Sequence, residues 1–425
     1  MTYGLLGETL SHSYSPKIHG LLADYEYRLF PTAPEELESF LTSGDFAGLN
    51  VTIPYKKAVI PYLAELSPRA QKLGSVNTVV RRADGTLYGD NTDYAGFRYM
   101  LTGHEAAVQG KKALVLGSGG ASVTVAQVLR DLGACAVVVI SRTGEDNYEN
   151  LERHADAGVL VNATPVGMYP NNGVSPVDLA RLPALSLVAD VIYNPAKTAL
   201  MLQAEALGIP AVGGLSMLVA QAKYSADLFL GRPLPNSVIR QVEQRIAGQM
   251  KNIILIGMPG CGKTVIGKRL AAILGRKWID LDRKIEAEAG KAIPEIFAEE
   301  GEEGFRRRET ACVAQICSRS GCVISTGGGV VTRPENRDLL RQNGTVVYLR
   351  RELDKTYMAQ VMGNRERVEK RPMFQTKTPE ELAAERLPLY LAWSDIKILN
   401  VGVNETAWQL ISFLGLSPKK RGKKK

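Results

Sequence analysis

The sequence predicts an α/β protein of more than one domain, and three observations lead to this prediction. The chain has 425 residues, which is too long for one hydrophobic core at the usual domain size of roughly 100 to 200 residues. Twice, an apolar segment runs into a glycine-rich turn and then into a helical pattern, first at Lys111–Leu116 and again at Ile253–Ile256. A strand, a glycine turn and a helix in this order are typical of α/β domains with parallel sheets.

Composition indicates a globular protein and argues against several functional classes. Hydrophobic residues make up 45% of the chain and charged residues 23%, which is ordinary for a globular protein. No window approaches the roughly 18 uncharged apolar residues of a membrane helix, and no leader pattern opens the chain. We therefore expect a cytoplasmic protein that does not contact a membrane.

The cysteines and the basic residues give no sign of a metal or nucleic-acid site. No C-x-x-C pair is present, which predicts buried, reduced thiols at Cys135, Cys261, Cys312, Cys317 and Cys322. Of the net charge of +8, six charges lie in residues 419–425 and only +2 remains elsewhere. A terminal run of like charges is usually a disordered tail, so no nucleic-acid partner is expected.

The first hundred residues carry polar clusters at the ends of short β-like runs. A strand at Thr2–Leu6 precedes hydroxyl-rich residues 11–16, which could be turn formers and helix caps or a cradle for a carboxylate or polyol. A strand over residues 46–57, the stretch Ser75–Thr78 and the stretch Gly89–Asp93 follow. Amides, hydroxyls, one lysine and one aspartate suit a small hydroxylated acid better than an apolar ligand.

Residues 111–140 predict a dinucleotide-binding βαβ unit. The strand Lys111–Leu116 leads into Gly117-Ser118-Gly119-Gly120-Ala121, and Ala136–Ile140 is the next strand. Such a turn lets a pyrophosphate sit at a helix N-terminus. Arg142 follows the second strand where an acidic residue would bind a ribose, which favours a 2′-phosphate and hence NADP(H), although Glu145 is close enough to leave NAD open. Further on, strands are predicted to end near Asn162 and Asp190, and one long helix to run from Gly213 towards Ile246.

Residues 1 to about 248 resemble shikimate dehydrogenase. SHSYSPKIH, NVTIPYK, SVNT, DNTD, GSGG, SRT, NATPVGM, DVIYNP and MLVAQ follow one another in the family's order. The resemblance implies a substrate domain of residues 1–100 and 216–248 and a Rossmann NADP-binding domain of residues 101–215. Gly20 and Ser141 depart from the asparagines that the family often has at these positions.

This resemblance implies reduction of 3-dehydroshikimate with NADPH. Lys56 and Asp93 would be the catalytic pair, because hydride addition to a ketone creates an alkoxide that an acid must protonate; a solvated salt bridge is the alternative. The implied substrate residues are Ser13, Ser15, Asn50, Thr52, Lys56, Asn77, Asp93 and Gln221. The implied cofactor residues are Gly117, Gly119, Gly120, Ala121, Ser141, Arg142, Thr143, Tyr193, Gly214 and Met217.

A phosphate-binding loop follows Met250, which looks like the start of an independent protein. Ile253–Ile256 runs into Gly257-x-x-x-x-Gly262-Lys263-Thr264 and then a helical pattern, a context that predicts a nucleotide site with Thr264 on Mg²⁺. Later strands are predicted at Lys277–Asp282, Cys322–Ser325 and Thr345–Leu349. Asp280 and Asp282 would lie on one side of the extended chain, to serve Mg²⁺ and a substrate hydroxyl, or else would cap a helix.

Three further segments after the phosphate-binding loop have patterns that predict a structure or a function. Residues 290–309 read as a charged helix with a solvated face. The glycines at 327–329 demand either close backbone approach or positive φ, as a binding loop does. Residues 364–378 are polar and basic and predict a mobile lid.

Residues 250–418 resemble shikimate kinase, and residues 419–425 would be the disordered tail. DLD from Asp280, FRRRE, TGGG, KRPMF and ERLPLY follow the loop in the family's order. The resemblance implies that shikimate is bound by Asp282, Arg306, Gly328, Gly329 and Arg386, with Asp282 as orienter or base of the 3-hydroxyl. ATP would be bound by Gly260, Cys261, Gly262, Lys263, Thr264, Val265 and Arg371, with Lys263 and Arg371 serving the transferred phosphate and Mg²⁺ held by Thr264 and Asp280. Val265 replaces a second hydroxyl that relatives often carry.

Together the two resemblances predict a bifunctional enzyme of aromatic amino acid (chorismate) biosynthesis, which makes shikimate and then shikimate 3-phosphate. The alternatives are a dehydrogenase half that also accepts quinate, and one half that is a non-catalytic binding module. A kinase for gluconate or nucleotides would lack the arginine pair that is assigned to a carboxylate. A homodimer is compatible with the sequence, which leaves the oligomeric state open.

Overall fold

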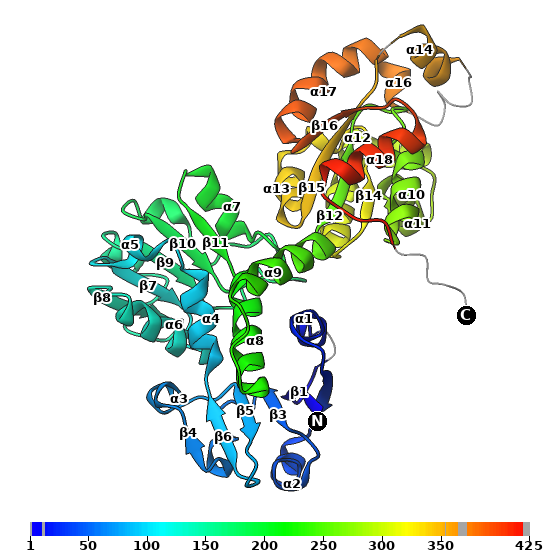
Figure 1. The fold of residues 1–425 in the computed structure, drawn as a ribbon. Helices are drawn as coiled ribbons and strands as arrows, with labels where there is room; N and C mark the ends of the chain where they lie inside the picture. Colours follow the sequence, from blue (N-terminus) through cyan, green and yellow to red (C-terminus); the bar gives the residue numbers. More distant parts are fainter. Residues whose placement is uncertain (1, 11–12, 353, 364–371, 420–425) are drawn as a thin grey trace, which may run out of the picture. The chain divides into compact units, whose positions relative to one another are not determined.

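A computed structural model describes residues 2–10, 13–352, 354–363 and 372–419. The chain divides into two compact units, residues 1–247 and 248–425. The described residues form three sheets, two in the first unit and one in the second (Figure 1). In this part of the chain no helix is long and apolar enough to cross a membrane. Helices and largely parallel sheets in both units confirm the predicted α/β fold class.

The first sheet has the strand order β2-β1-β3-β5-β6-β4. β1 pairs in parallel with β2 and β3, whereas β5 is antiparallel to both β3 and β6. The predicted strand over residues 46–57 ends at Val51, and the residues up to Lys57 form a turn. The elements are β1 (Thr2–Gly7), α1 (Ser15–Leu22), β2 (Glu26–Pro31), α2 (Leu37–Ser43), β3 (Gly48–Val51), β4 (Glu65–Leu66), α3 (Pro68–Leu73), β5 (Thr78–Arg81) and β6 (Leu87–Asp90).

The second sheet is parallel throughout, with the order β11-β10-β9-β7-β8. Ala113 and Val115 pack into a core with α4 and α6, whereas Leu114 and Leu116 pack into another with α7. Burial on both faces explains why these strands are apolar without alternation. The elements are α4 (Thr92–Met100), α5 (Glu105–Val108), β7 (Lys112–Leu116), α6 (Gly120–Asp131), β8 (Ala136–Ile140), β9 (Val159–Asn162), β10 (Leu187–Asp190), α7 (Ala199–Ala206) and β11 (Ala211–Gly213).

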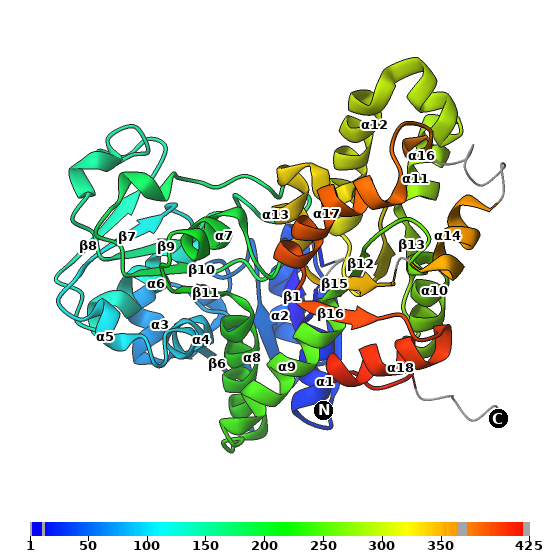
Figure 2. The same cartoon turned by 90° about the horizontal axis from the view of Figure 1, so that it is seen from above.

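The single long helix predicted from Gly213 towards Ile246 is wrong. The segment forms two helices, α8 (Leu215–Leu230) and α9 (Ser237–Met250). Gly231 takes a φ of 61° after the last turn of α8, and the prolines at 233 and 235 cannot continue a helix. α8 packs along α4 (Figures 1 and 2). α9 runs to Met250, so β12 begins almost at once.

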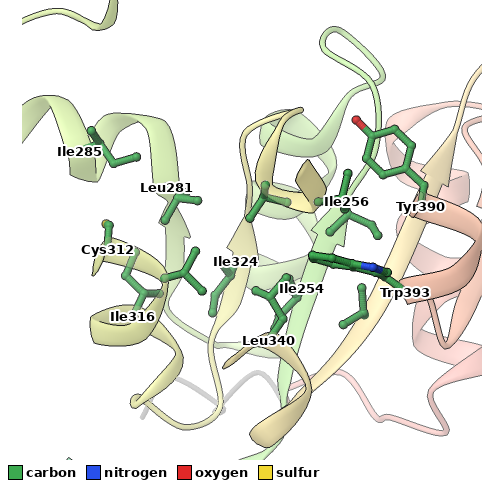
Figure 3. Packing of buried hydrophobic residues seen from close by; sticks show 14 of the residues in the cluster. Ile254, Ile256, Leu281, Ile285, Cys312, Ile316, Ile324, Leu340, Tyr390 and Trp393 are labelled. Carbon is green, nitrogen blue, oxygen red and sulfur yellow. The ribbon is translucent and has the colours of Figure 1, made fainter. Parts of the chain in front are cut away.

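The third sheet is also parallel, with the order β13-β14-β12-β15-β16. Ile254 and Ile256 pack with α11, α12, α13 and α17 (Figure 3), whereas Ile253 and Leu255 pack with α10 and α18, which lie on the opposite face of the sheet (Figure 2). The strands are β12 (Asn252–Ile256), β13 (Trp278–Asp280), β14 (Val323–Ser325), β15 (Gly344–Arg350) and β16 (Ile396–Leu399). The helices are α10 (Lys263–Leu274), α11 (Leu281–Ala289), α12 (Ile293–Cys317), α13 (Pro334–Gln342), α14 (Lys355–Met362), α16 (Met373–Thr376), α17 (Pro379–Trp393) and α18 (Val403–Phe413).

The cysteines are free thiols, and the expectation that all of them are buried is wrong for Cys135. This residue lies in the short turn between α6 and β8, where its side chain is exposed. Cys261, Cys312, Cys317 and Cys322 are buried in the second unit.

Candidate active sites

The first candidate site is a cavity at one edge of the first sheet. Asn50 pairs with Thr78, and Thr78 pairs with Asp90, so the end of β3, the start of β5 and the end of β6 lie in a row. Polar residues just beyond these three positions therefore meet. The cavity has a volume of ≈ 320 Å³. Its lining includes every residue predicted for the first substrate: Ser13, Ser15, Asn50, Thr52, Lys56, Asn77, Asp93 and Gln221.

Within this cavity, Lys56 and Asp93 form an ion pair. Lys56 Nζ donates a hydrogen bond of 2.6 Å to Asp93 Oδ2. Lys56 lies in the turn after β3, and Asp93 lies in the first turn of α4, where Asn91 caps the helix through a bond from Tyr94 N–H. The two side chains are 30% and 19% exposed. An ammonium with spare N–H donors that opens onto a cavity can give a proton to a ligand oxygen.

The predicted cofactor residues fall into two groups. Ala121, Tyr193, Gly214 and Met217 line the same cavity as the substrate residues. Gly117, Gly119 and Gly120 form the turn between β7 and α6, which begins at Gly120. Gly117 has a φ of 98°, and a side chain there would also meet Thr164, so glycine is required. The turn thus leads from a helix N-terminus to the cavity.

Ser141, Arg142 and Thr143 follow β8 and lie outside the lining of this cavity. Ile140 O accepts a bond of 2.8 Å from Gly117 N–H, so the end of β8 adjoins the glycine turn. Ser141 N–H donates to the carbonyl of Asp146, and Asp146 also pairs with His154 at 2.8 Å. These bonds fold the loop back on itself and leave the Arg142 side chain exposed. It is available to a phosphate beside the glycine turn.

The second candidate site surrounds the loop between β12 and α10. Gly257, Gly260 and Gly262 have φ values of 143°, 79° and 104°, which only glycine adopts readily. Lys263 is buried and donates to the carbonyls of Gly257 and Met258 at 2.7 and 2.9 Å. The loop borders a cavity of ≈ 350 Å³. Of the predicted ATP residues, Gly260, Gly262, Lys263, Thr264 and Val265 line it, whereas the Cys261 side chain is turned into the core.

Asp280 and Asp282 do not share an extended strand, and that part of the prediction is wrong. β13 ends at Asp280, which caps α11 by accepting a bond of 3.3 Å from Arg283 N–H. Asp282 therefore lies in the first turn of α11. The Thr264 hydroxyl donates to Asp280 Oδ2 at 2.9 Å, which brings together a hydroxyl and a carboxylate of the kind that Mg²⁺ prefers. Asp282 instead lines the cavity.

Asp282 is half-buried and has other carboxylates nearby. Burial, with the nearby carboxylates of Glu309 and Asp280, raises the pKa of Asp282 to about 7. Burial also raises the pKa of Glu309, a residue that sequence reasoning missed. A carboxyl group that titrates near neutral pH in a cavity is suited to accept a proton or to orient a hydroxyl.

Residues 290–309 do not form the fully solvated face that was expected. α12 is interrupted at Gly301, and the side chains of Arg306 and Glu309 are 6% and 0% exposed. Arg306 Nη1 donates to Glu309 Oε2 at 2.6 Å, one turn apart on the helix. The i, i+3 spacing of Arg306 and Glu309 within FRRRE was the signal that could have predicted this pair.

Close approach explains the glycines after β14. None of the three described residues Gly327, Gly328 and Gly329 has a positive φ. A Cβ on Gly327 would lie 2.7 Å from Asp282 Oδ1 and 2.8 Å from Glu309 Oε1, and one on Gly329 would collide with the Arg306 guanidinium. The backbone thus forms one wall of the cavity.

Arg386, on α17, also lines the cavity. It is 1% exposed, and its Nε and Nη2 have no hydrogen-bond partner among the described residues. It lines the cavity together with Arg306. On the same helix, the Tyr390 hydroxyl donates to the carbonyl of Gly328, and its ring lies at the margin of the core cluster in Figure 3. Two guanidinium groups facing one cavity can bind a carboxylate.

Two supports of the phosphate loop were not predicted. Asn400 Nδ2 donates to the carbonyl of Cys261 at 2.8 Å, and Arg351 donates to that of Gly260 at 3.3 Å. Arg371 and residues 364–370 of the predicted lid lie outside the described residues.

Family models match both parts of the chain. Residues 5–79 match the model of the shikimate dehydrogenase substrate binding domain. Residues 259–414 match the model of shikimate kinase. The two matches therefore fall in different compact units.

Curated relatives and solved structures resemble the first unit. A shikimate dehydrogenase (NADP(+)) of Clostridium beijerinckii is 35% identical over 255 residues, which are 56% of this chain and 94% of that protein. One of Oleidesulfovibrio alaskensis is 40% identical over 262 residues, 55% of this chain and 91% of that protein.

The solved structures agree with these relatives. A chorismate mutase/shikimate 5-dehydrogenase fusion protein from Clostridium acetobutylicum is 36% identical with a TM-score of 0.54, covering 58% of this chain and 96% of its own. Shikimate 5-dehydrogenase of Thermus thermophilus, solved in complex with NADP(H) and shikimate, is 32% identical with a TM-score of 0.52 and covers 58% and 99%.

Proposed function

This chain belongs to the shikimate dehydrogenase family and carries a shikimate kinase domain, and on that premise we propose that it performs two consecutive reactions. The first unit reduces 3-dehydroshikimate to shikimate with NADPH. The second transfers the γ-phosphoryl group of ATP to the 3-hydroxyl of shikimate. One observation carries the proposal: each unit has a cavity beside a nucleotide-binding turn, and each cavity is lined by groups suited to a small hydroxylated acid.

In the first unit, Lys56 is the proton donor. NADPH, when bound, supplies a hydride to the ring ketone, and the oxygen becomes an alkoxide. Lys56 Nζ has N–H donors beyond the one that Asp93 accepts, and it protonates this oxygen. Asp93 holds the ammonium in place by its bond of 2.6 Å. The products are a secondary alcohol and NADP⁺, so atoms and charges balance.

The remaining lining residues of the first cavity hold the substrate. The hydroxyls of Ser13, Ser15 and Thr52 can bind the carboxylate or the ring hydroxyls, as can the amides of Asn50, Asn77 and Gln221. Arg142, exposed beside the glycine turn, pairs with the 2′-phosphate of the cofactor. An exposed arginine at this position favours NADP(H) over NAD.

In the second unit, Asp282 orients the attacking 3-hydroxyl and accepts its proton. Lys263 reaches the β- and γ-phosphates of ATP from the start of α10, where the helix N-terminus also favours anions. Thr264 and Asp280 would supply two oxygen ligands for Mg²⁺, and the ion would neutralise charge on the phosphates. Arg306 and Arg386 bind the shikimate carboxylate.

A substrate panel tests the proposal on the purified chain. We expect NADPH oxidation with 3-dehydroshikimate and Mg²⁺-dependent ADP formation with shikimate. NADP⁺ reduction with shikimate but not quinate would exclude the alternative that the first unit also serves quinate. ADP formation with gluconate or a nucleoside monophosphate, and none with shikimate, would overturn the kinase assignment. A unit that binds its ligand without turnover would be a binding module instead.

A further inference from the structure

Behind the first cavity, a buried serine joins several residues that line it. Ser225 lies in the middle of α8, and its side chain is 0% exposed. Its hydroxyl oxygen lies 2.7 Å from Asn50 Nδ2, 2.8 Å from Thr78 Oγ1, 2.9 Å from Thr92 Oγ1 and 3.0 Å from the Gln221 carbonyl oxygen. Ser225, Thr78 and Thr92 are outside the lining that the described residues give the cavity. These three hydroxyls therefore connect β3, β5, α4 and α8 behind the residues that line the cavity.

The number of donors and acceptors at Ser225 determines how the Asn50 amide is oriented. A serine hydroxyl has one proton and two lone pairs. The carbonyl of Gln221 can only accept, so the bond of 3.0 Å uses the Ser225 proton. Ser225 can then accept from two of its three other neighbours, one of which is Asn50 Nδ2. Asn50 consequently presents Nδ2 to Ser225, and its Oδ1 accepts a bond of 2.9 Å from the Tyr27 hydroxyl.

A second branch of the cluster orients Asn77. Its Oδ1 accepts a bond of 2.6 Å from the backbone N–H of Thr92, a group that can only donate. The hydroxyls of Thr78 and Thr92 lie 3.1 and 3.2 Å from the same oxygen. One of these hydroxyls can donate to Asn77, and the other is then free to donate to Ser225. The amide nitrogen of Asn77 is left for the cavity.

The side-chain amide of Gln221 is also oriented by a bond to the protein. Its Nε2 donates to the carbonyl of Leu218 at 2.9 Å, which leaves Oε1 to accept from a ligand. The cavity therefore offers an N–H donor at Asn77 and an acceptor at Gln221. Hydroxyl groups can satisfy both, because a hydroxyl donates and accepts.

We propose that Ser225 is a positioning residue of the dehydrogenase site, which sets the amide orientation of Asn50 directly and, through Thr78 and Thr92, supports the orientation that the Thr92 backbone N–H gives Asn77. This inference rests on the proposed function and deepens it. Without the Ser225 oxygen, Asn50 Nδ2 loses its bond of 2.7 Å and keeps only longer bonds, of 3.4 Å to Thr78 Oγ1 and 3.5 Å to the Asn77 carbonyl. The amide is then held less firmly and can turn over. If the Asn50 amide turns over, its N–H donor takes the place of its carbonyl acceptor, and binding of the hydroxylated acid weakens. The glycine turn that binds the cofactor is not changed.

Steady-state oxidation of shikimate by NADP⁺ with the full-length chain tests this role. For Ser225→Ala we expect the KM for shikimate to rise about tenfold, as for loss of one oriented hydrogen bond in a polar site. The KM for NADP⁺ and the kcat should stay within about threefold of wild type. Phe229→Leu is the matched control, because Phe229 is buried one turn along α8 and stacks on Tyr3. It should lower the melting temperature without raising the KM for shikimate.

A double-mutant cycle separates positioning from general loosening. If Ser225 acts through Asn50, adding Ser225→Ala to Asn50→Ala should change the KM for shikimate less than about twofold. Fully additive effects, an unchanged KM in Ser225→Ala, or an equal rise in the KM for NADP⁺ would overturn the inference.

If Ser225→Ala does not fold, Thr78→Val removes the neighbouring hydroxyl and must raise the KM for shikimate. Absence of shikimate oxidation in the wild type would instead refute the proposed function, with kinase activity of the same sample as the measure of intact protein.

Discussion

Lys56 and Asp93, 37 residues apart in the sequence, form an ion pair with a distance of 2.6 Å between Nζ and Oδ2. The register of the first sheet brings them together, because it aligns Asn50, Thr78 and Asp90 at one edge. Both side chains are less than a third exposed, at 30% and 19%. The pair is therefore not a freely solvated salt bridge, and its exposed part opens onto the first cavity.

Asp93→Asn keeps the shape of the side chain and removes its charge. We expect the kcat for shikimate oxidation to fall about 100-fold, because the Lys56 ammonium loses the carboxylate that holds it. Steady-state kinetics with NADP⁺ measure this change. Asp131→Asn is a matched control, because Asp131 pairs with Lys72 at 3.3 Å on the surface of the same unit. Full activity in Asp93→Asn would mean that the pair is only structural.

Arg142→Ala tests the choice of cofactor. The exposed guanidinium follows β8 beside the glycine turn, so its loss should raise the KM for NADPH about tenfold or more while leaving that for NADH nearly unchanged. The KM values for both cofactors with 3-dehydroshikimate measure the effect. Arg153→Ala, another exposed arginine of this unit, should change neither value. Equal losses with both cofactors would argue against a 2′-phosphate contact.

Arg386→Lys tests carboxylate recognition in the second unit. Nε and Nη2 of this buried arginine have no partner among the described residues, and lysine cannot reproduce their paired geometry. We expect the KM for shikimate to rise about 100-fold with the KM for ATP nearly unchanged. Coupled ADP assays measure both constants, with exposed Arg337→Lys on α13 as the control. Shikimate methyl ester, which lacks the carboxylate charge, should bind the wild type weakly, and Arg386→Lys should weaken its binding little further. A large further loss of affinity for the ester would contradict the role of Arg386 in binding the carboxylate.

The kinase reaction should depend on pH through Asp282. Its pKa is raised to about 7 by burial and by the carboxylates of Glu309 and Asp280. The group is therefore protonated below pH 7 and ionised above it. Because the ionised form accepts the proton of the 3-hydroxyl, kcat/KM for shikimate should fall as the pH falls through about 7. Asp282→Asn should lower the rate and remove this step from the profile. A profile that is flat from pH 6 to about 8 in the wild type would contradict the role of Asp282 as base.

The sequence was a good guide to elements whose signal is local. The strands β8 and β12, the glycine turns and the starts of α6 and α10 follow from apolar runs and glycine spacing. All predicted substrate residues of the first unit border one cavity. Most of them follow strand ends that lie side by side in the sheet, whereas Gln221 comes from helix α8. Their catalytic and binding roles stay predictions until the variants are measured.

Features that depend on distant parts of the chain were not predicted. Burial of Glu309 follows from packing of α12 against the wall at Gly327, which a charged sequence does not reveal. Ser225 looks like an ordinary helix residue, and its four neighbours come from positions up to 175 residues away. The prediction extended the strand to Asp282, whereas β13 ends at Asp280 and α11 follows. The sequence of these residues fits a longer strand as well as it fits a helix cap.

The most direct test of two separate sites is one assay sequence on wild type and two variants. NADPH oxidation is measured with 3-dehydroshikimate, and ADP release is then measured after addition of ATP and Mg²⁺. We predict both signals in the wild type, loss of the first alone in Lys56→Ala when shikimate is supplied for the second step, and loss of the second alone in Lys263→Ala. If either variant lost both activities while remaining folded, or if wild type consumed NADPH but released no ADP with shikimate, the account of two independent active sites would be contradicted.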